Sequence, residues 1–267
     1  MDMLRKPFGN TVDYDKKKQM EIDWYEKGDA EKKGFVARIL HWKIFYSPGR
    51  NSFNYIFPKI QMKEMLESEL KYAKAGKLLI APCGSGDDYK YVQSFSDNIY
   101  GMDLSPAAIR SCPEEMKARE GDILSSGYPE NYFDVIVSPL FFHHLIKIGF
   151  EPFLDEFIRI LKPGGKLVIL EPSLWYPLNL VTRPLKKLFN PYGEVEDEGP
   201  FHPGHMIRKL KEAGFKNIKM QGASFSHCSF YVPLARFVNF VTRPILKIWP
   251  IDYFAWMVLF AAEKGGG

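Results

Sequence analysis

The chain has 267 residues and a formal net charge of +4, from 36 Lys and Arg residues and 32 Asp and Glu residues. Hydrophobic residues make up 46% of it, charged residues 25% and aromatic residues 15%, which excludes a disordered or collagen-like chain. The length suits one large α/β domain with additions, or two small domains. A surplus of four positive charges is too small to indicate nucleic-acid binding, although a local basic surface stays open.

The cysteines and the apolar stretches bear on the cellular compartment. Cys83, Cys112 and Cys228 show no C-x-x-C spacing, and their odd number is not typical of a disulfide framework, which favours a reducing compartment. Residues 1–18 contain no apolar segment of the kind found in secretory signals. No uncharged window in residues 230–262 reaches the ~18 to 20 residues that span a bilayer. We expect a cytoplasmic protein and leave peripheral membrane contact open.

Residues 1–76 are predicted to form an N-terminal helical cap. Residues 15–33 are dense in charge with few apolar side chains, as in a solvated amphipathic helix, and residues 35–45 form a more apolar helix. The S-P-G-R-N sequence at 47–51 is expected to break the pattern. A third helix is predicted over residues 57–75, closed by a glycine in the usual C-cap position.

From residue 77 onward, short apolar runs alternate with helical segments. Strands that alternate with helices indicate an α/β fold with a parallel sheet and right-handed crossovers. One strand is expected to begin at Lys166, directly after a Pro-Gly-Gly turn. The predicted strands are residues 78–81, 98–103, 133–137, 166–171, 218–223 and 256–262, with a helix at 203–213 between the fourth and the fifth.

The most informative stretch is L-L-I-A-P-C-G-S-G-D at residues 78–87, where a buried strand enters a turn with Gly84 and Gly86 and then a helix. Such a turn lets a ligand approach the backbone at the carboxyl end of a strand, although a tight turn without a ligand is the alternative. The dinucleotide fingerprint G-x-G-x-x-G is not met, because Tyr89 occupies the third glycine position. Two carboxylates directly after Gly86 would repel a pyrophosphate and suit a cationic ligand better.

Two further carboxylates lie at probable strand ends. Asp103 can accept hydrogen bonds from a ribose diol. The alternative is that Asp103 or Ser105 caps the next helix, and the two roles are compatible. Asp122 can accept from the exocyclic amine of adenine, or it can be a surface turn residue.

Over residues 77–215 the sequence resembles the class I S-adenosylmethionine-dependent methyltransferases, and among them the type 11 group. The resemblance implies a Rossmann-like α/β fold with a seven-stranded, mostly parallel sheet whose last strand is antiparallel, together with N-terminal helices and helical lid insertions. It also implies a core at residues 77–267, insertions near 173–192 and 225–253, and S-adenosyl-L-methionine as the cofactor. The segments that carry it are A-P-C-G-S-G-D, Y-G-M-D-L-S, G-D-I, N-Y-F-D-V-I-V-S-P-L-F-F-H-H-L and L-K-P-G-G-K-L-V-I-L-E-P.

The resemblance also implies a set of cofactor-binding residues. Two positions depart from the family pattern. Ile80 stands where the family has an acid that holds the cofactor's amino group, and Pro82 lacks a backbone donor. Asp87 or Asp88 can supply the missing negative charge, or can cap the helix. The implied residues are Ala81, Pro82, Cys83, Gly84, Ser85, Gly86, Asp87, Asp103, Leu104, Asp122, Ile123 and Ser138.

Methyl transfer to a weakly acidic acceptor requires close placement, exclusion of water and a base. His143 and His144 follow the strand beside which the family has its acceptor pocket, and imidazole suits proton transfer near neutral pH. The alternative, of equal weight, is that these histidines only order the loop after the strand. His202 and His205 have no third histidine or cysteine nearby, so we expect no metal site.

The expected acceptor follows from three aromatic segments. These are the N-terminal helices, residues 175–192 and residues 225–249, of which the last two carry basic residues and no acid. Most of the aromatic side chains can belong to a core, but the combination also fits an apolar or anionic acceptor, or an anionic membrane surface. We expect a methyltransferase acting on a small, lipophilic or aromatic acceptor, with no nucleic-acid partner and an oligomeric state left open. A non-catalytic cofactor-binding subunit and a peripheral membrane protein on the same fold are the alternatives.

Overall fold

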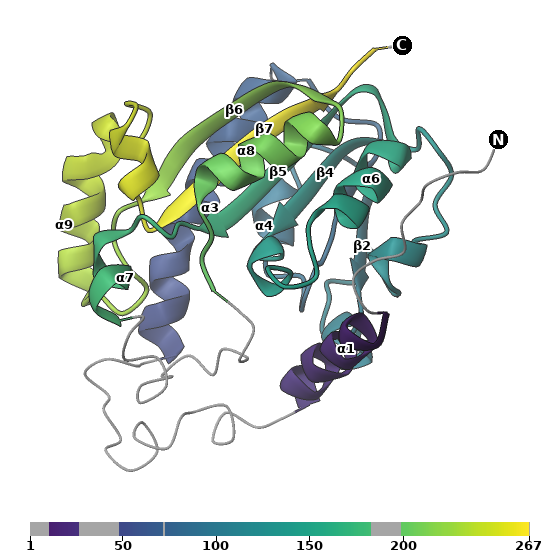
Figure 1. Cartoon of the computed structure of the whole chain (residues 1–267), viewed down its shortest axis with the longest axis horizontal. Helices are drawn as coiled ribbons and strands as arrows, with labels where there is room; N and C mark the ends of the chain where they lie inside the picture. The colour runs from purple at the N-terminus through teal and green to yellow at the C-terminus, as the bar shows by residue number, and fades with distance from the viewer. Residues whose placement is uncertain (1–10, 27–47, 72, 183–198, 267) are drawn as a thin grey trace.

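The structure is a computed structural model that describes residues 11–26, 48–71, 73–182 and 199–266 (Figure 1). The predicted helix at 35–45, and most of the aromatic segment at 175–192, lie outside these residues. None of the described helices is both long enough and apolar enough to cross a membrane.

A single seven-stranded sheet forms the centre, in the order β3-β2-β1-β4-β5-β7-β6. The first five strands run parallel, whereas β7 is antiparallel to both β5 and β6. The predicted seven-stranded, mostly parallel sheet with an antiparallel last strand is therefore confirmed. The strands are β1 (Leu78–Ile80), β2 (Ile99–Asp103), β3 (Lys117–Glu120), β4 (Phe133–Pro139), β5 (Leu161–Pro172), β6 (Phe215–Ser224) and β7 (Met257–Lys264).

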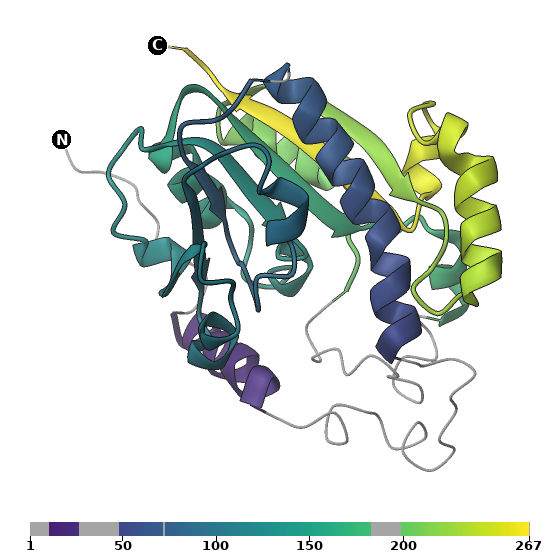
Figure 2. The ribbon, with the colours of Figure 1, turned by 180° about the vertical axis from the view of Figure 1, so that it is seen from behind.

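Helices cover both faces of the sheet (Figures 1 and 2). On one face lie α6 (Glu151–Ile160) and α8 (Pro203–Glu212), and on the other lie α3 (Pro48–Leu70) and α4 (Tyr89–Val92). The other α-helices of the described residues are α1 (Thr11–Glu26), α5 (Pro106–Arg110), α7 (Pro177–Thr182) and α9 (Val232–Thr242).

Several predicted boundaries are wrong. The helix expected from residue 15 begins at Thr11, and the strand expected from residue 218 begins at Phe215. The helix expected at residues 57–75 begins at Pro48 and ends at Leu70. It can begin at Pro48 because proline is well tolerated in the first turn of a helix, where its missing N–H costs no hydrogen bond. The strand expected from Lys166 begins at Leu161, which pairs with Phe133. The Pro-Gly-Gly turn lies inside this strand as a bulge, since Gly164 takes a φ of +76°.

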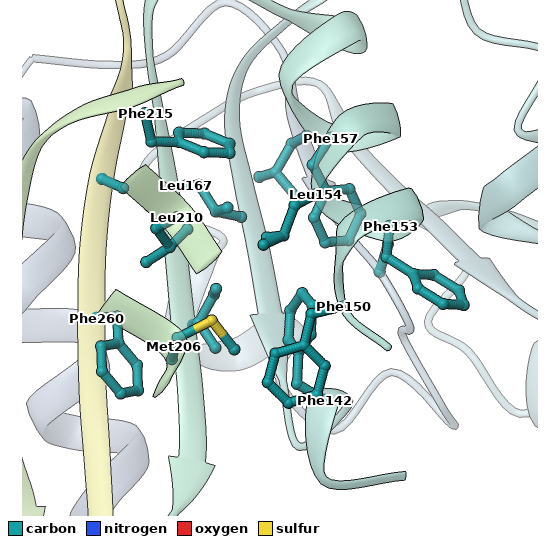
Figure 3. Packing of buried hydrophobic residues seen from close by; sticks show 14 of the residues in the cluster. Phe142, Phe150, Phe153, Leu154, Phe157, Leu167, Met206, Leu210, Phe215 and Phe260 are labelled. Atoms are coloured by element: carbon teal, nitrogen blue, oxygen red, sulfur yellow. The ribbon is translucent and has the colours of Figure 1, made fainter. Parts of the chain in front are cut away.

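Apolar side chains fill both interfaces between helix and sheet. On the face of α6 and α8, the fully buried Phe153 and Phe157 belong to the same cluster as Leu210 (Figure 3). On the opposite face, Met62 and Leu66 of α3 join the cluster that holds β1. Because both faces are covered, ligand access is left to the edge where the parallel strands end.

Candidate functional site

A cavity of about 400 Å³ lies where β1, β2 and β4 end. Residues of α1 and α3, and of the chain after β3, β5 and β6, complete its lining. Six of the predicted cofactor residues line it, namely Ala81, Pro82, Asp103, Leu104, Asp122 and Ile123, and so do both predicted histidines, His143 and His144.

Asp103 is the last residue of β2, and only 7% of its surface is exposed. Its Oδ2 accepts the backbone N–H of Gly84 at 2.8 Å, and its Oδ1 accepts that of Ser105 at 3.0 Å. Burial raises the pKa of Asp103, while these backbone donors lower it. The cap of α5 is Ser105, whose side chain accepts the N–H of Ala108. Each oxygen of Asp103 therefore keeps a second acceptor site for a ligand hydroxyl.

Asp122 is held by helix α1, a contact that the sequence did not reveal. The hydroxyl of Tyr14 donates to Asp122 Oδ1 at 2.7 Å, and Lys18 Nζ lies 3.3 Å from Oδ2. Asp122 Oδ1 also accepts the backbone N–H of Leu124 at 2.9 Å. Burial, followed by the neighbouring Asp122, raises the pKa of Tyr14, so its hydroxyl stays protonated and donates.

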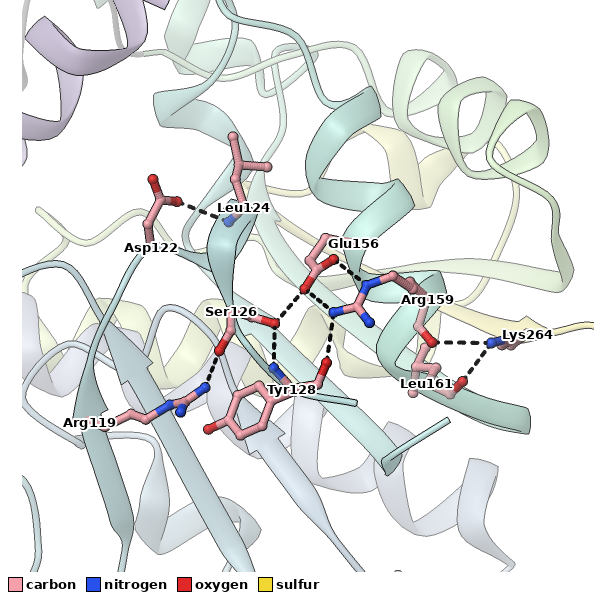
Figure 4. A network of polar contacts seen from close by, with 9 residues as sticks. All are labelled: Arg119, Asp122, Leu124, Ser126, Tyr128, Glu156, Arg159, Leu161 and Lys264. Carbon is pink, nitrogen blue, oxygen red and sulfur yellow. Dashed lines mark hydrogen bonds and ion pairs between the residues drawn. The ribbon is translucent and has the colours of Figure 1, made fainter. Parts of the chain in front are cut away.

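A polar network fixes the chain that follows Asp122 (Figure 4). Ser126 donates its hydroxyl to Glu156 of α6, and its carbonyl accepts from the guanidinium of Arg119. Arg159 donates to Glu156 at 2.7 Å and to the carbonyl of Tyr128 at 2.8 Å. The connection between β3 and β4 is thereby tied to α6, which gives Asp122 a rigid support.

The glycine turn itself stands outside the cavity lining. A Cβ at Gly86, where φ is +77°, would approach Pro113 to 2.5 Å, so glycine is required there by packing and by backbone conformation. The contact of these residues with the cofactor stays a prediction. The predicted residues that are not part of the lining are Cys83, Gly84, Ser85, Gly86, Asp87 and Ser138.

Asp87 and Asp88, predicted to replace the missing acid at position 80, do not line the cavity. Ile80 is fully buried in the core, Asp87 is exposed, and Asp88 pairs with Lys59 of α3 at 3.0 Å. The carboxylate that lines the cavity in addition to Asp103 and Asp122 is that of Glu21, on α1.

His143 is joined to a buried carboxylate. It lies just after β4, and its Nδ1 is 2.8 Å from Oε2 of Glu171, which is fully buried in β5. Glu171 Oε1 also accepts the backbone N–H groups of Phe141 at 2.7 Å and Phe142 at 2.6 Å. Such donors stabilise an ionised carboxylate inside a protein. We therefore assign the proton of the neutral ring to Nδ1, which donates to Glu171 and leaves the lone pair on Nε2.

His144 has a different partner. Its Nδ1 lies 3.0 Å from Oε1 of Glu21, which is 2.7 Å from Nζ of Lys17. The rings of His143 and His144 are 4.0 Å apart between centroids. The structure thus brings both predicted histidines into the cavity, and only His143 is held by a buried carboxylate of the sheet.

The lining is aromatic on the side of β5 and β7. Tyr55 of α3 and His227 both contact Trp256, with ring centroids 5.1 Å and 5.2 Å away. Burial lowers the pKa of His227 to about 4, so its ring is neutral near pH 7. Asn54 of α3 holds the neighbouring loop by donating to the carbonyl of Cys228 at 2.9 Å.

The sheet order separates two kinds of lining. The carboxylates Asp103 and Asp122 come from β2 and from the chain after β3, whereas Trp256 adjoins β7 on the other side of β4. His143 follows β4 and so stands between them. The three carboxylates Asp103, Asp122 and Glu21 outnumber the paired Lys17 and Lys18, so this part of the cavity is acidic. Such a region suits a cationic ligand that carries hydroxyl and amine donors, which is the chemistry of S-adenosylmethionine. The residues present fit that cofactor.

Comparison with known proteins agrees with this fit. Residues 79–169 match the family model described as a methyltransferase domain. A demethylmenaquinone methyltransferase of Geobacillus sp. (strain WCH70) is 22% identical over 200 residues, which cover 65% of this chain and 85% of that protein. The chain is a class I S-adenosylmethionine-dependent methyltransferase. S-adenosyl-L-methionine is its cofactor, and the dinucleotide alternative is set aside.

Two further similarities concern the methyltransferase fold and other acceptors. A methyltransferase structure from Thermotoga maritima, described as a possible histamine N-methyltransferase, has a TM-score of 0.60 at 16% identity and covers 86% of this chain and 96% of that one. Phosphoethanolamine N-methyltransferase 1 of Triticum aestivum is 29% identical over 174 residues, which cover 58% of this chain and 34% of that protein.

Sequence reasoning missed several lining residues of the methyltransferase and one residue behind the lining. Tyr14, Glu21 and His227 gave no local signal, because each acquires its role from segments distant in the chain. Glu171 did give a local signal, because it is a lone acid at the end of the apolar run L-V-I-L. A carboxylate at the buried end of a central strand is costly unless it is paired, and this indicates a functional partner.

Proposed function

We propose that the methyltransferase acts on a small, lipophilic acceptor that bears an aromatic ring with a weakly acidic hydroxyl. The observation that carries the proposal is the His143–Glu171 pair, at 2.8 Å, between the acidic and the aromatic parts of one cavity. The aromatic part offers Tyr55 and Trp256 to a flat ring. The proposed class shares a flat, apolar ring with the quinone named for the demethylmenaquinone methyltransferase relatives, and the two-electron-reduced form of such a quinone bears ring hydroxyls.

Each side chain has a defined task in this proposal. When bound, the cofactor would supply an electrophilic methyl group, attached to its positively charged sulfonium sulfur. Asp103 and Asp122 hold the adenosine part, and the aromatic walls place the acceptor and exclude water. His143 takes the acceptor's hydroxyl proton at Nε2, and Glu171 stabilises the imidazolium that forms. The acceptor oxygen then bonds to the methyl carbon in place of that proton, while the bond from this carbon to the sulfonium sulfur breaks and leaves a neutral thioether.

The test compares His143→Ala with His144→Ala. We expect His143→Ala to lower the rate of methyl transfer by ~10²- to 10⁴-fold while cofactor affinity is kept, because only the base is lost. His144→Ala is the matched control, and it should lose far less, since His144 pairs with Glu21 of α1 rather than with a buried carboxylate. Near-full turnover in both variants would mean that neither histidine is the base.

The acceptor class is tested separately with the purified protein and radiolabelled cofactor. The reduced, quinol form of demethylmenaquinone and simple naphthols represent the proposed class, and phosphoethanolamine and a sterol represent the acceptors named for other relatives. Transfer to the aromatic hydroxyl compounds supports the proposal, and transfer to the sterol alone would contradict it, because a sterol has no aromatic ring. Transfer to phosphoethanolamine alone would contradict it, because that acceptor is small, charged and without a ring.

A further inference from the structure

Helix α9 has its apolar side turned outward. Its inner side carries the fully buried Ala235 and, one turn later, Asn239. Asn239 Oδ1 accepts the hydroxyl of Ser224 at 2.9 Å, and its Nδ2 donates to Ser226. A surface helix normally buries its large apolar residues and exposes its polar ones. In α9 the buried residue is the small Ala235 and the polar Asn239 is half-buried, whereas large apolar side chains are exposed.

The outward side is large and aromatic. Leu234, Phe237 and Val241 follow the spacing of one helix face, and Phe240 is 81% exposed. The turn after α9 adds Trp249, which is 76% exposed. We call this set the α9 surface. Its exposed apolar members are Tyr231, Leu234, Phe237, Phe240, Val241, Ile248, Trp249, Ile251 and Phe254.

The charge of the α9 surface has one sign. From residue 222 to 251 the chain has no Asp or Glu. Arg236 and Lys247 are exposed, and the guanidinium of Arg236 lies 5.1 Å from the ring centroid of Phe53 of α3. Arg243 is paired with Glu64 of α3 at 2.6 Å. Asp252 follows, but it is buried, and burial raises the pKa of its carboxyl. The exposed aromatic residues are thus accompanied by cations.

We propose that the α9 surface docks on an anionic lipid bilayer. Exposed aromatic rings with Lys and Arg beside them fit the headgroup region, where Trp and Tyr partition and anionic lipids attract basic side chains. An eleven-residue helix is ~16 Å long and cannot span a bilayer, so α9 lies in the plane of the interface. A protein partner would also cover apolar residues, but the acid-free, basic surround favours anionic lipid.

The α9 surface is continuous with the cavity wall. The loop that leads from β6 into α9 contributes His227 and Cys228 to the lining. Asn54 of α3 holds this loop through the carbonyls of Cys228 at 2.9 Å and Phe230 at 2.7 Å. Figure 1 shows α9 and α7 together at one end of the molecule, away from α1. Docking there, taken with the proposed lipophilic acceptor, brings the aromatic wall next to the lipid phase.

The test is co-sedimentation of the full chain with vesicles of phosphatidylcholine alone or mixed with phosphatidylglycerol. We expect binding to the mixed vesicles that weakens as salt is added. Arg236→Glu/Lys247→Glu should lower the partition coefficient at least ~30-fold. Phe240→Ser/Trp249→Ser should lower it ~100-fold, and neither pair should unfold the protein, because all four side chains are exposed.

A matched control variant distinguishes docking by the α9 surface from a general effect of the protein's net charge. Lys211→Glu/Lys216→Glu makes the same change of charge at exposed positions near the start of β6 and should bind like the wild type. Equal recovery of the wild type in the supernatant with both vesicle types would overturn the docking and leave the proposed acceptor class intact. A concentration-dependent dimer that Phe240→Ser/Trp249→Ser abolishes, without vesicle binding, would make a second copy the occupant and would also overturn it.

Discussion

Asp103 serves the backbone and the ligand site with the same two oxygens. It accepts the N–H groups of Gly84 and Ser105, and it lines the cavity. We expect Asp103→Ala to weaken S-adenosylmethionine binding by ~1.5 to 3 kcal/mol, about 10- to 150-fold, because ribose hydroxyls lose a charged acceptor. Isothermal titration calorimetry measures it. Asp97→Ala, at an exposed aspartate outside the lining that pairs with Lys74, should bind normally, and unchanged affinity in folded Asp103→Ala would refute the assignment.

His227 should make stability depend on pH. Its folded pKa is about 4, against 6.5 in the unfolded chain, because burial disfavours the charged ring. The unfolded state therefore binds the extra proton between these values. The free energy of unfolding is full above pH 6.5 and falls by up to about 3 kcal/mol as the pH drops towards 4. Urea titrations of the wild type and His227→Asn should show this fall only in the wild type; parallel curves would contradict it.

Among the elements, α1 closes the acidic part of the cavity through few contacts. The shorter of its two contacts with Asp122 is the hydrogen bond that the Tyr14 hydroxyl donates, at 2.7 Å; the other, from Lys18, is 3.3 Å. We expect Tyr14→Phe to release bound cofactor about fivefold faster, since one hydrogen bond of ~1 kcal/mol no longer holds the helix. Stopped-flow displacement measures the rate. Tyr132→Phe removes a hydroxyl that contacts Tyr100 at 3.3 Å, outside the cavity lining, and should leave the rate unchanged. Equal rates in all three proteins would mean that α1 does not close over the cofactor.

Local elements were accessible to sequence reasoning, and long-range pairings were not. The strands around Leu79 and Ile136 are predicted because a short apolar run that ends in a turn is typical of a buried strand. The Tyr14–Asp122 bond joins residues 108 apart, and no periodicity reports such a contact. The outward side of α9 was hidden for a related reason. Its aromatic residues were visible, but which face meets the protein depends on Ser224 and Ser226, from another segment.

At the scale of the whole molecule, coverage of both sheet faces explains where chemistry can occur. Apolar clusters fill the space under α3 on one face and under α6 and α8 on the other. The carboxyl ends of the parallel strands are therefore the place where polar side chains meet a cavity. The carboxylates from β2 and β3, the histidines after β4 and the aromatic wall near β7 follow the strand order across this edge.

The position of β7 has a consequence for synthesis of the chain. Residues 257–264 form the strand between β5 and β6, so both neighbours lack their shared partner until this late segment has left the ribosome. At ~5 to 20 residues per second, the interval after β6 lasts a few seconds. During that interval two strand edges with unpaired N–H and C=O groups are open to other chains or to a chaperone. A chain on a ribosome that stalls after β6 therefore exposes edges that can associate with other chains. Pairing of β7 with β5 and β6 removes these edges.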